Sequence, residues 1–245
     1  MVKRFVLAMG ALVLLGVGFT LAGAACGGGG GGEATPTATS LAVPAGVKAL
    51  LEQMVLQPAD VPAGFIAIEQ VFGSNEQVAA ESADPQAELA KLKRWGRIWG
   101  YEVTYEPGGT AAATATASPG ASEAIVFSVD SAVSIYQSAE GASASFAEAT
   151  QAARSTDWTT LFSGAMDLEV QEVPAPDLAD EVLWLRITGK AEVGERTFAQ
   201  DVILLRQGPN RGTLQAGLFG TTEEGRQLVE RMARAQVERM ASAAP

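Results

Sequence analysis

VLWLRITGKAEVGERTFAQDVILLRQGPNRGTLQAGLF, residues 182–219, contains three apolar runs separated by turn residues. The runs cover Val182–Thr188, Thr197–Arg206 and Gly212–Phe219, and the links between them contain glycine, proline and asparagine. Runs of this kind are typical of β-strands, and links of this composition are typical of hairpin turns. The stretch therefore predicts an antiparallel meander of three strands.

Further strands are predicted on the N-terminal side of the meander, at 64–72, 99–105 and 125–135, because apolar and polar residues alternate there. In the first segment we expect Ile66, Ile68 and Phe72 to share one face. In the last we expect one core-facing side, formed by Ile125, Phe127, Val129, Val133 and Ile135. Residues 107–120 are rich in alanine and threonine, and we interpret them as a disordered loop joining two strands of a large hairpin.

Helices are predicted at 46–56, 84–96, 138–153 and 221–240 from apolar positions at helical spacing. Asp84-Pro85 is typical of a helix start, and Thr221-Thr-Glu-Glu224 has the pattern of a capping box. The whole pattern predicts one α+β domain over residues 46–245. Its expected architecture is one curved antiparallel sheet of about five to six strands packed against two to three helices.

The N-terminus has the pattern of an export signal. Met1–Arg4 is basic, Phe5–Ala25 is apolar, and the small residues 23–25 precede Cys26. This resembles a bacterial lipoprotein signal, which implies cleavage after residue 25 and a lipid on the sulfur of Cys26. The leucine usual three positions before that cysteine is Gly23 here. The alternative is an uncleaved signal anchor, because about 20 apolar residues can span a bilayer.

Residues 26–45 follow as a glycine-, threonine- and proline-rich segment, which we interpret as a flexible tether. Either interpretation of the N-terminus predicts an extracytoplasmic domain held at the bacterial membrane.

Charge and composition exclude several functions. The chain has 17 basic and 28 acidic residues, a net charge of −11, and loss of Lys3 and Arg4 with the signal makes it more acidic still. Nucleic acid is therefore not expected as a partner, because its binding depends on neutralising phosphates. The chain has one cysteine and no histidine, which excludes an internal disulfide, histidine-dependent nucleophilic catalysis and imidazole metal ligands.

Leu56-Gln-Pro-Ala-Asp-Val-Pro-Ala-Gly-Phe65, followed by a strand, a central helix, three hairpin strands and a terminal helix, resembles a loose group of envelope lipoproteins. That group is similar to the extracellular sensor-like domain of bacterial receptor serine/threonine kinases. The resemblance covers most of residues 46–240 and implies a curved sheet, backed by helices, with a ligand-binding cleft. This chain departs from it in lacking the family's disulfide cysteines.

Acidic residues are the remaining candidates for catalysis. Asp177, Asp180 and Glu181 gather beside a predicted strand, and Glu223 and Glu224 stand at a predicted helix start. Paired carboxylates can hydrolyse glycosides, but carboxylates at loop ends and in first helical turns are usually solvated or capping groups. The 177–181 spacing also lacks the pattern of a calcium-binding loop. We expect no catalytic residues, no cofactor and no metal.

One basic segment stands out in this acidic chain, and its candidate ligand-binding residues are Lys91, Arg94, Trp95, Arg97 and Trp99. One interpretation is a site for an anionic ligand with the tryptophans as a platform. The other is a solvated helix face whose long side chains cover the tryptophans. Tyr101, Tyr105 and Trp184 are expected in the core.

The predicted function is a non-enzymatic, lipid-anchored envelope lipoprotein that binds a small molecule, a lipid or an envelope protein. One alternative is a structural or assembly lipoprotein that docks on an envelope complex. Another is a carboxylate-dependent hydrolase of cell-wall glycan.

Overall fold

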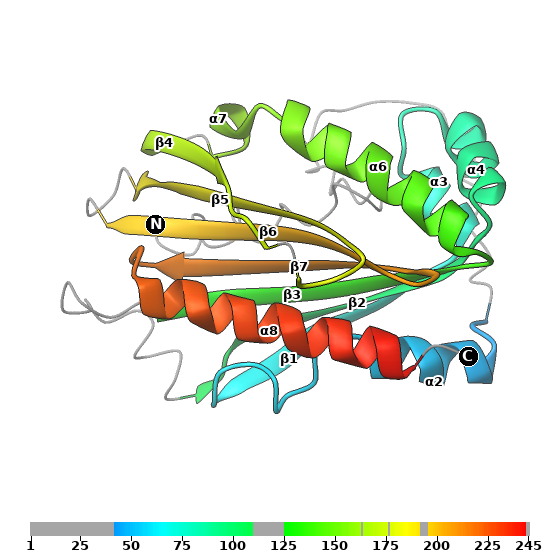
Figure 1. Ribbon diagram of the computed structural model, residues 1–245, viewed down its shortest axis with the longest axis horizontal. Helices are drawn as coiled ribbons and strands as arrows, with labels where there is room; N and C mark the ends of the chain where they lie inside the picture. Colours follow the sequence, from blue (N-terminus) through cyan, green and yellow to red (C-terminus); the bar gives the residue numbers. More distant parts are fainter. Residues whose placement is uncertain (1–41, 110–124, 163, 176, 192–195, 244–245) are drawn as a thin grey trace, which may run out of the picture.

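A computed structural model describes residues 42–109, 125–162, 164–175, 177–191 and 196–243. Within these ranges the chain forms seven strands and six helices, and the strands make one antiparallel sheet (Figure 1). Along the chain the elements are α2 (Ala45–Met54), β1 (Phe65–Gly73), α3 (Asn75–Ala80), α4 (Pro85–Arg94), β2 (Arg97–Pro107), β3 (Ile125–Tyr136), α6 (Ala139–Ser155), α7 (Trp158–Leu161), β4 (Ala165–Glu172), β5 (Glu181–Ala191), β6 (Thr197–Gln207), β7 (Asn210–Phe219) and α8 (Glu223–Ser242).

The sheet is two meanders joined side by side. Its strand order is β1-β2-β3-β7-β6-β5-β4, and every pair of neighbours is antiparallel. β5, β6 and β7 form the predicted three-stranded meander, and β2 and β3 form the predicted large hairpin. The α+β class and the single antiparallel sheet are therefore confirmed.

The predicted numbers of strands and helices were too low. The additional strand is β4, and short helices α3 and α7 were also not predicted. β4 pairs with β5 at one edge of the sheet, and in its sequence Met166, Leu168 and Val170 alternate with polar residues. This alternation is typical of a strand, so β4 could have been predicted from the sequence.

Helices α2 and α8 cover one face of the sheet, and in Figure 1 α8 lies in front of the strands. Thr222 caps α8 by accepting a hydrogen bond from the Gly225 amide. Further along, the buried Gln236 donates to the main-chain carbonyl of Ala132 at 3.0 Å. At Gly212, a Cβ would lie 2.8 Å from Met240 Sδ, so only glycine lets α8 approach the sheet this closely.

Helices α6 and α7 cover part of the opposite face: α6 lies over the central strands, mainly β6 and β7, and α7 lies against β4. This second core contains mostly aromatic and branched aliphatic side chains: Phe146, Trp158, Phe162, Leu183, Leu185, Ile187, Phe198, Val202 and Leu204. The central strands are consequently buried on both faces, and the side chain of Asp130 on β3 is only 7% exposed although the sequence placed it opposite the core.

Register shifts change the predicted faces of two strands. In β3 the shift between Val126 and Ser128 sends Phe127 into the α6 core, while Val129 stays in the α8 core. In β1 the shift between Ala67 and Glu69 breaks the expected alternation. The expectation that Phe127 shares a face with Val129 was therefore wrong, because a bulge inverts the side-chain alternation beyond it.

The predicted burial of three aromatic residues is confirmed, and the predictions for the N-terminus and the alanine-rich loop concern residues that the structure does not describe. Tyr101, Tyr105 and Trp184 are 6%, 3% and 1% exposed, as predicted for core aromatics. The signal at 1–25, Cys26, the first part of the tether and residues 110–120 of the predicted loop lie outside the described residues.

Candidate functional site

An open groove lies between the C-terminal half of α6 and the start of β5. Its volume is about 540 Å³, within the usual range for small-molecule sites. The lining residues are Phe146, Ala147, Thr150, Gln151, Arg154, Ser155 and Glu181. The groove exists because α6 presents small and polar side chains on the flank that does not pack into the second core.

The charges of this groove are neutralised within the protein. Arg154 donates to both carboxylate oxygens of Glu172 on β4, at 3.2 and 2.8 Å. Glu181 accepts from Arg206 Nε. Because both charged residues already have partners, the groups left to bind a ligand are the uncharged side chains of Thr150, Gln151 and Ser155.

Thr150 is the unusual polar residue of the groove. Its side chain is nine-tenths buried, and its Oγ1 has no hydrogen-bond partner. A buried hydroxyl without a partner costs roughly 1–3 kcal/mol unless something bonds to it. Gln151 beside it is exposed on the helix surface. The Gln151 amide is directly accessible in the groove, whereas the buried Thr150 hydroxyl reaches a bound group only after its side chain rotates.

The predicted basic and aromatic residues fall into two groups. Lys91 lies on α4, 2.6 Å from both Glu88 and Glu148, and its ammonium is 5.2 Å from the centre of the Trp95 ring. The pKa of Lys91 is raised, because hydrogen bonds and charge attraction from these two carboxylates outweigh burial, which lowers it. Arg94 is exposed at the last turn of the same helix.

Arg97 and Trp99 lie away from that helix surface. Arg97 is 4% exposed and donates to Ser134 Oγ, the Gly73 carbonyl and Asn75 Oδ1. Burial lowers the pKa of Arg97 to about 10. Trp99 packs against the α8 core on the opposite face of the sheet. Lys91 and Trp95 therefore lie together, whereas Arg97 is buried in the sheet and Trp99 lies on its other face. The five residues do not form one site.

A row of acidic residues crosses β1, β2 and β3 on the face away from α8. Glu69 is opposite Thr104, and Thr104 is opposite Asp130 and donates to it at 2.7 Å. Burial raises the pKa of Asp130 to about 7, and it raises the pKa of Glu102 to about 8 with repulsion from Asp130 and Glu69. In the described ranges, no group of acidic, histidine or cysteine residues has an arrangement that holds a metal.

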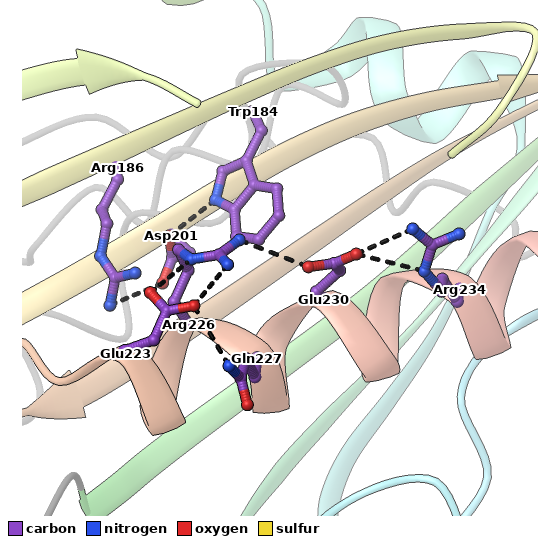
Figure 2. A network of polar contacts seen from close by, with 8 residues as sticks. All are labelled: Trp184, Arg186, Asp201, Glu223, Arg226, Gln227, Glu230 and Arg234. Carbon is purple, nitrogen blue, oxygen red and sulfur yellow. Dashed lines mark hydrogen bonds and ion pairs between the residues drawn. The ribbon is translucent and has the colours of Figure 1, made fainter. Parts of the chain in front are cut away.

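A buried polar network attaches the start of α8 to the sheet (Figure 2). Trp184 Nε1 donates to Asp201 at 2.7 Å, and Arg186 Nη2 lies 3.8 Å from the other oxygen of Asp201. Burial raises the pKa of Asp201, although Arg186 and Trp184 lower it. Figure 2 shows the Arg226 guanidinium below the Trp184 ring and next to Asp201, held by Glu223 on its own helix. Charge attraction between Arg226 and Asp201 links the helix to the sheet.

Asp180, Glu181 and Glu223, three of the five acidic candidates for catalysis, are engaged in ion pairs. Asp180 and Glu181 both bind Arg206, and Asp180 also accepts from the Gly208 amide at 2.8 Å. Glu223 binds Arg226, and hydrogen bonds from Arg226 and Gln227 lower the pKa of Glu223 to about 2. These contacts fix the carboxylates to neighbouring turns.

No protein-family model and no curated protein matches this chain. One solved structure that is similar is the extracellular domain of PknH from Mycobacterium tuberculosis. The match covers 77% of this chain and 95% of that one, with 10% identity and a TM-score of 0.44. This neighbour belongs to the class of receptor-kinase domain that the sequence resemblance named. At such a TM-score the likeness carries no argument about function.

Sequence reasoning did not find the α6 groove or the acidic row. The groove residues lie in an alanine-rich helix whose pattern indicates only close packing on a sheet. The acidic row joins residues of three strands, so it depends on register, which short-range patterns do not determine. Within the described ranges, no helix has the length and apolar content needed to cross a membrane.

Proposed function

We propose that this chain is an extracytoplasmic, lipid-anchored protein whose folded domain binds a small uncharged ligand and performs no chemistry on it. The observation that carries the proposal is the α6 groove, which is lined by the exposed amide of Gln151 and by Thr150, whose buried hydroxyl has no hydrogen-bond partner. A ligand with both hydroxyl or amide groups and an apolar side fits this lining. A charged ligand fits poorly, because Arg154 and Glu181 already have partners.

A binding role without catalysis is also supported by the ion pairs that the candidate catalytic carboxylates form. A glycoside hydrolase needs two carboxyl groups that face a bound sugar. Asp180 and Glu181 instead share one arginine, and Glu223 is tied to its own helix. We therefore propose a non-catalytic domain, and replacing both Asp180 and Glu181 with amides should leave any glycan-processing readout unchanged.

The groove is tested by native mass spectrometry on the full-length chain. We expect a co-purifying small mass that is released on denaturation. Gln151→Trp fills the open side of the groove, so this variant should lose that mass. Gln171→Trp, at an exposed glutamine of β4 outside the groove, is the matched control and should retain it. No bound mass in the wild type, or equal loss in both variants, would contradict the proposal.

The lipid anchor is tested separately in the bacterial host. Wild-type chain should incorporate a labelled fatty acid, and Cys26→Ala should lose the label because the only sulfhydryl is gone. If Cys26→Ala stays in the membrane fraction and the wild type takes up no label, the chain is an uncleaved signal-anchored protein instead.

A further inference from the structure

Strand β1 is an unusually apolar sheet edge. Among the described residues it pairs only with β2, so its other side presents unpaired main-chain groups. Ile66 and Ile68 on this strand are 55% and 50% exposed, more than any other large apolar side chain described. Its sequence, Phe-Ile-Ala-Ile-Glu-Gln-Val-Phe-Gly, contains one charged residue. Exposed edges of this composition readily accept another strand.

The opposite edge, β4, is protected. It has three acidic side chains, Asp167, Glu169 and Glu172, within eight residues. Asp167 also adopts a φ of 54°, which interrupts the regular strand. Charges and irregular backbone are the usual means of preventing edge pairing. Both edges contain a register shift, so the difference between them lies in the charges and in the backbone at Asp167.

Four carboxyl groups gather on the face beside β1, and Glu69 on the strand itself is exposed. Glu69, Glu102, Glu106 and Asp130 lie close enough to one another to raise carboxyl pKa values. No described basic residue forms an ion pair with any of these four. Ile66 is opposite Glu106, and Val71 is opposite Glu102, so apolar and acidic side chains alternate along this corner of the sheet.

We infer that the β1 edge binds an extended polypeptide segment of a partner protein, in which apolar residues alternate with lysine or arginine. The segment adds to the sheet as a strand, and its main chain pairs with the outer side of β1. Ile66 is opposite Glu106 and so lies on the face of the acidic row. The basic side chains of the segment point to this face, where their aliphatic stems contact Ile66 and their charged ends reach Glu69 and Glu106. Its apolar side chains point to the α8 face. A second copy of this chain is disfavoured, because each copy carries a net charge of −11. This site is separate from the α6 groove.

The probe is a fluorescent peptide of alternating lysine and valine, added to the full-length chain in neutral detergent. We expect saturable binding that weakens as salt increases. Ile68→Lys places a positive charge on the edge and should weaken binding about tenfold or more. Ile66→Lys should do the same, and Val170→Lys on β4, at a similarly exposed residue, should have no effect. Unfolding midpoints check that each variant folds.

A charge exchange tests the acidic row. Glu69→Lys should weaken binding of the lysine peptide and strengthen binding of a glutamate-valine peptide. The proposal is overturned if Val170→Lys reduces binding as much as Ile68→Lys does. It is also overturned if a peptide N-methylated along one edge binds equally well, since main-chain pairing is then not used. A wild-type dimer that Ile68→Lys dissociates would show that the occupant is a second copy.

Discussion

Gly100 on β2 is required by the buried Arg97 guanidinium. A Cβ at residue 100 would overlap Arg97 Nη2 and would lie 3.0 Å from Ser134 Oγ. Arg97 is held by three hydrogen bonds, so it cannot move aside without losing them. Gly100→Ala should therefore lower the free energy of unfolding by roughly 1–3 kcal/mol, as measured by urea denaturation.

Gly46→Ala is the control for that substitution. Gly46 lies in α2, and a Cβ there meets no atom within 4 Å. Alanine also favours the helix, so this variant should be as stable as the wild type or more stable by up to about 1 kcal/mol. Equal effects of the two substitutions would mean that Arg97 is not packed as described.

The acidic row predicts that stability falls as pH rises. The folded-state pKa values of Asp130 and Glu102, about 7 and about 8, lie above the unfolded values. The folded state therefore binds more protons than the unfolded state between about pH 4 and pH 8. Over this window each group lowers the free energy of unfolding by at most about 1.4 kcal/mol per pH unit. Urea denaturation at about pH 5 and about pH 8 measures the change.

Glu102→Gln separates this effect from general pH sensitivity. The variant should show a smaller loss of stability between the two pH values than the wild type. Glu169→Gln, on the exposed β4 edge, removes a carboxyl far from the row and should behave as the wild type. An unchanged slope in Glu102→Gln would show that this carboxyl titrates normally.

The sequence did not predict the direction in which individual side chains point. The sequence grouped Arg97 with Lys91 because the two are close along the chain. The register shift between Arg97 and Trp99 and the interruption at Gly96, which has a φ of 68°, decide where each side chain points. The end of the helix at Gly96 could be predicted from the sequence, but the register shift has no pattern that identifies it in a single sequence. The side-chain directions of Arg97 and Trp99 therefore could not be predicted.

At the scale of elements, long periodic segments were predictable and irregular ones were not. The α8 stripe and the β5–β7 hairpins follow from apolar spacing and turn residues, because the same pattern determines both local structure and burial. The bulges in β1 and β3 were missed, and with them the exposed positions of Ile66 and Ile68. The α6 groove could not be foreseen, because it depends on where a helix lies relative to β5.

Helix α8 gives a direct test of this amphipathic pattern. Met232 is 1% exposed and packs in the α8 core, whereas Arg231 beside it is exposed. Met232→Ala should lower the free energy of unfolding by roughly 2–5 kcal/mol because it leaves a cavity. Arg231→Ala should change it by no more than about 0.5 kcal/mol. Thermal denaturation of both variants measures the contrast, and similar midpoints would place α8 away from the sheet.

At the scale of the whole molecule, composition and element order were sufficient for the fold class. Strand order was only partly accessible, because hairpin neighbours follow from short links but the pairing of β3 with β7 joins distant parts of the chain. The contacts between α2 and α8 also join segments that are far apart in the sequence, so they could not be predicted either. Asp60, in the turn that follows α2, forms an ion pair with Arg239 of α8 at 2.6 Å, which ties this turn to the helix.

The long-range pairing of β3 with β7 has a kinetic consequence. It joins Ile125 to Phe219 at one end and Ile135 to Asn210 at the other, whereas the remaining pairs connect neighbours along the chain. Closing so long a loop costs entropy before any contact compensates for it, so the two meanders should form first and the junction last.

Stopped-flow refolding distinguishes early from late contacts. Val202→Ala, in the β5–β6 hairpin, should mainly slow folding, and Val129→Ala, at the junction, should mainly accelerate unfolding. The reverse assignment would mean that the junction nucleates the sheet. If the expected order holds, a newly made chain passes through a stage in which β3 and β7 are both edge strands without their mutual pairing, and the molecule is most vulnerable to misassociation during that interval.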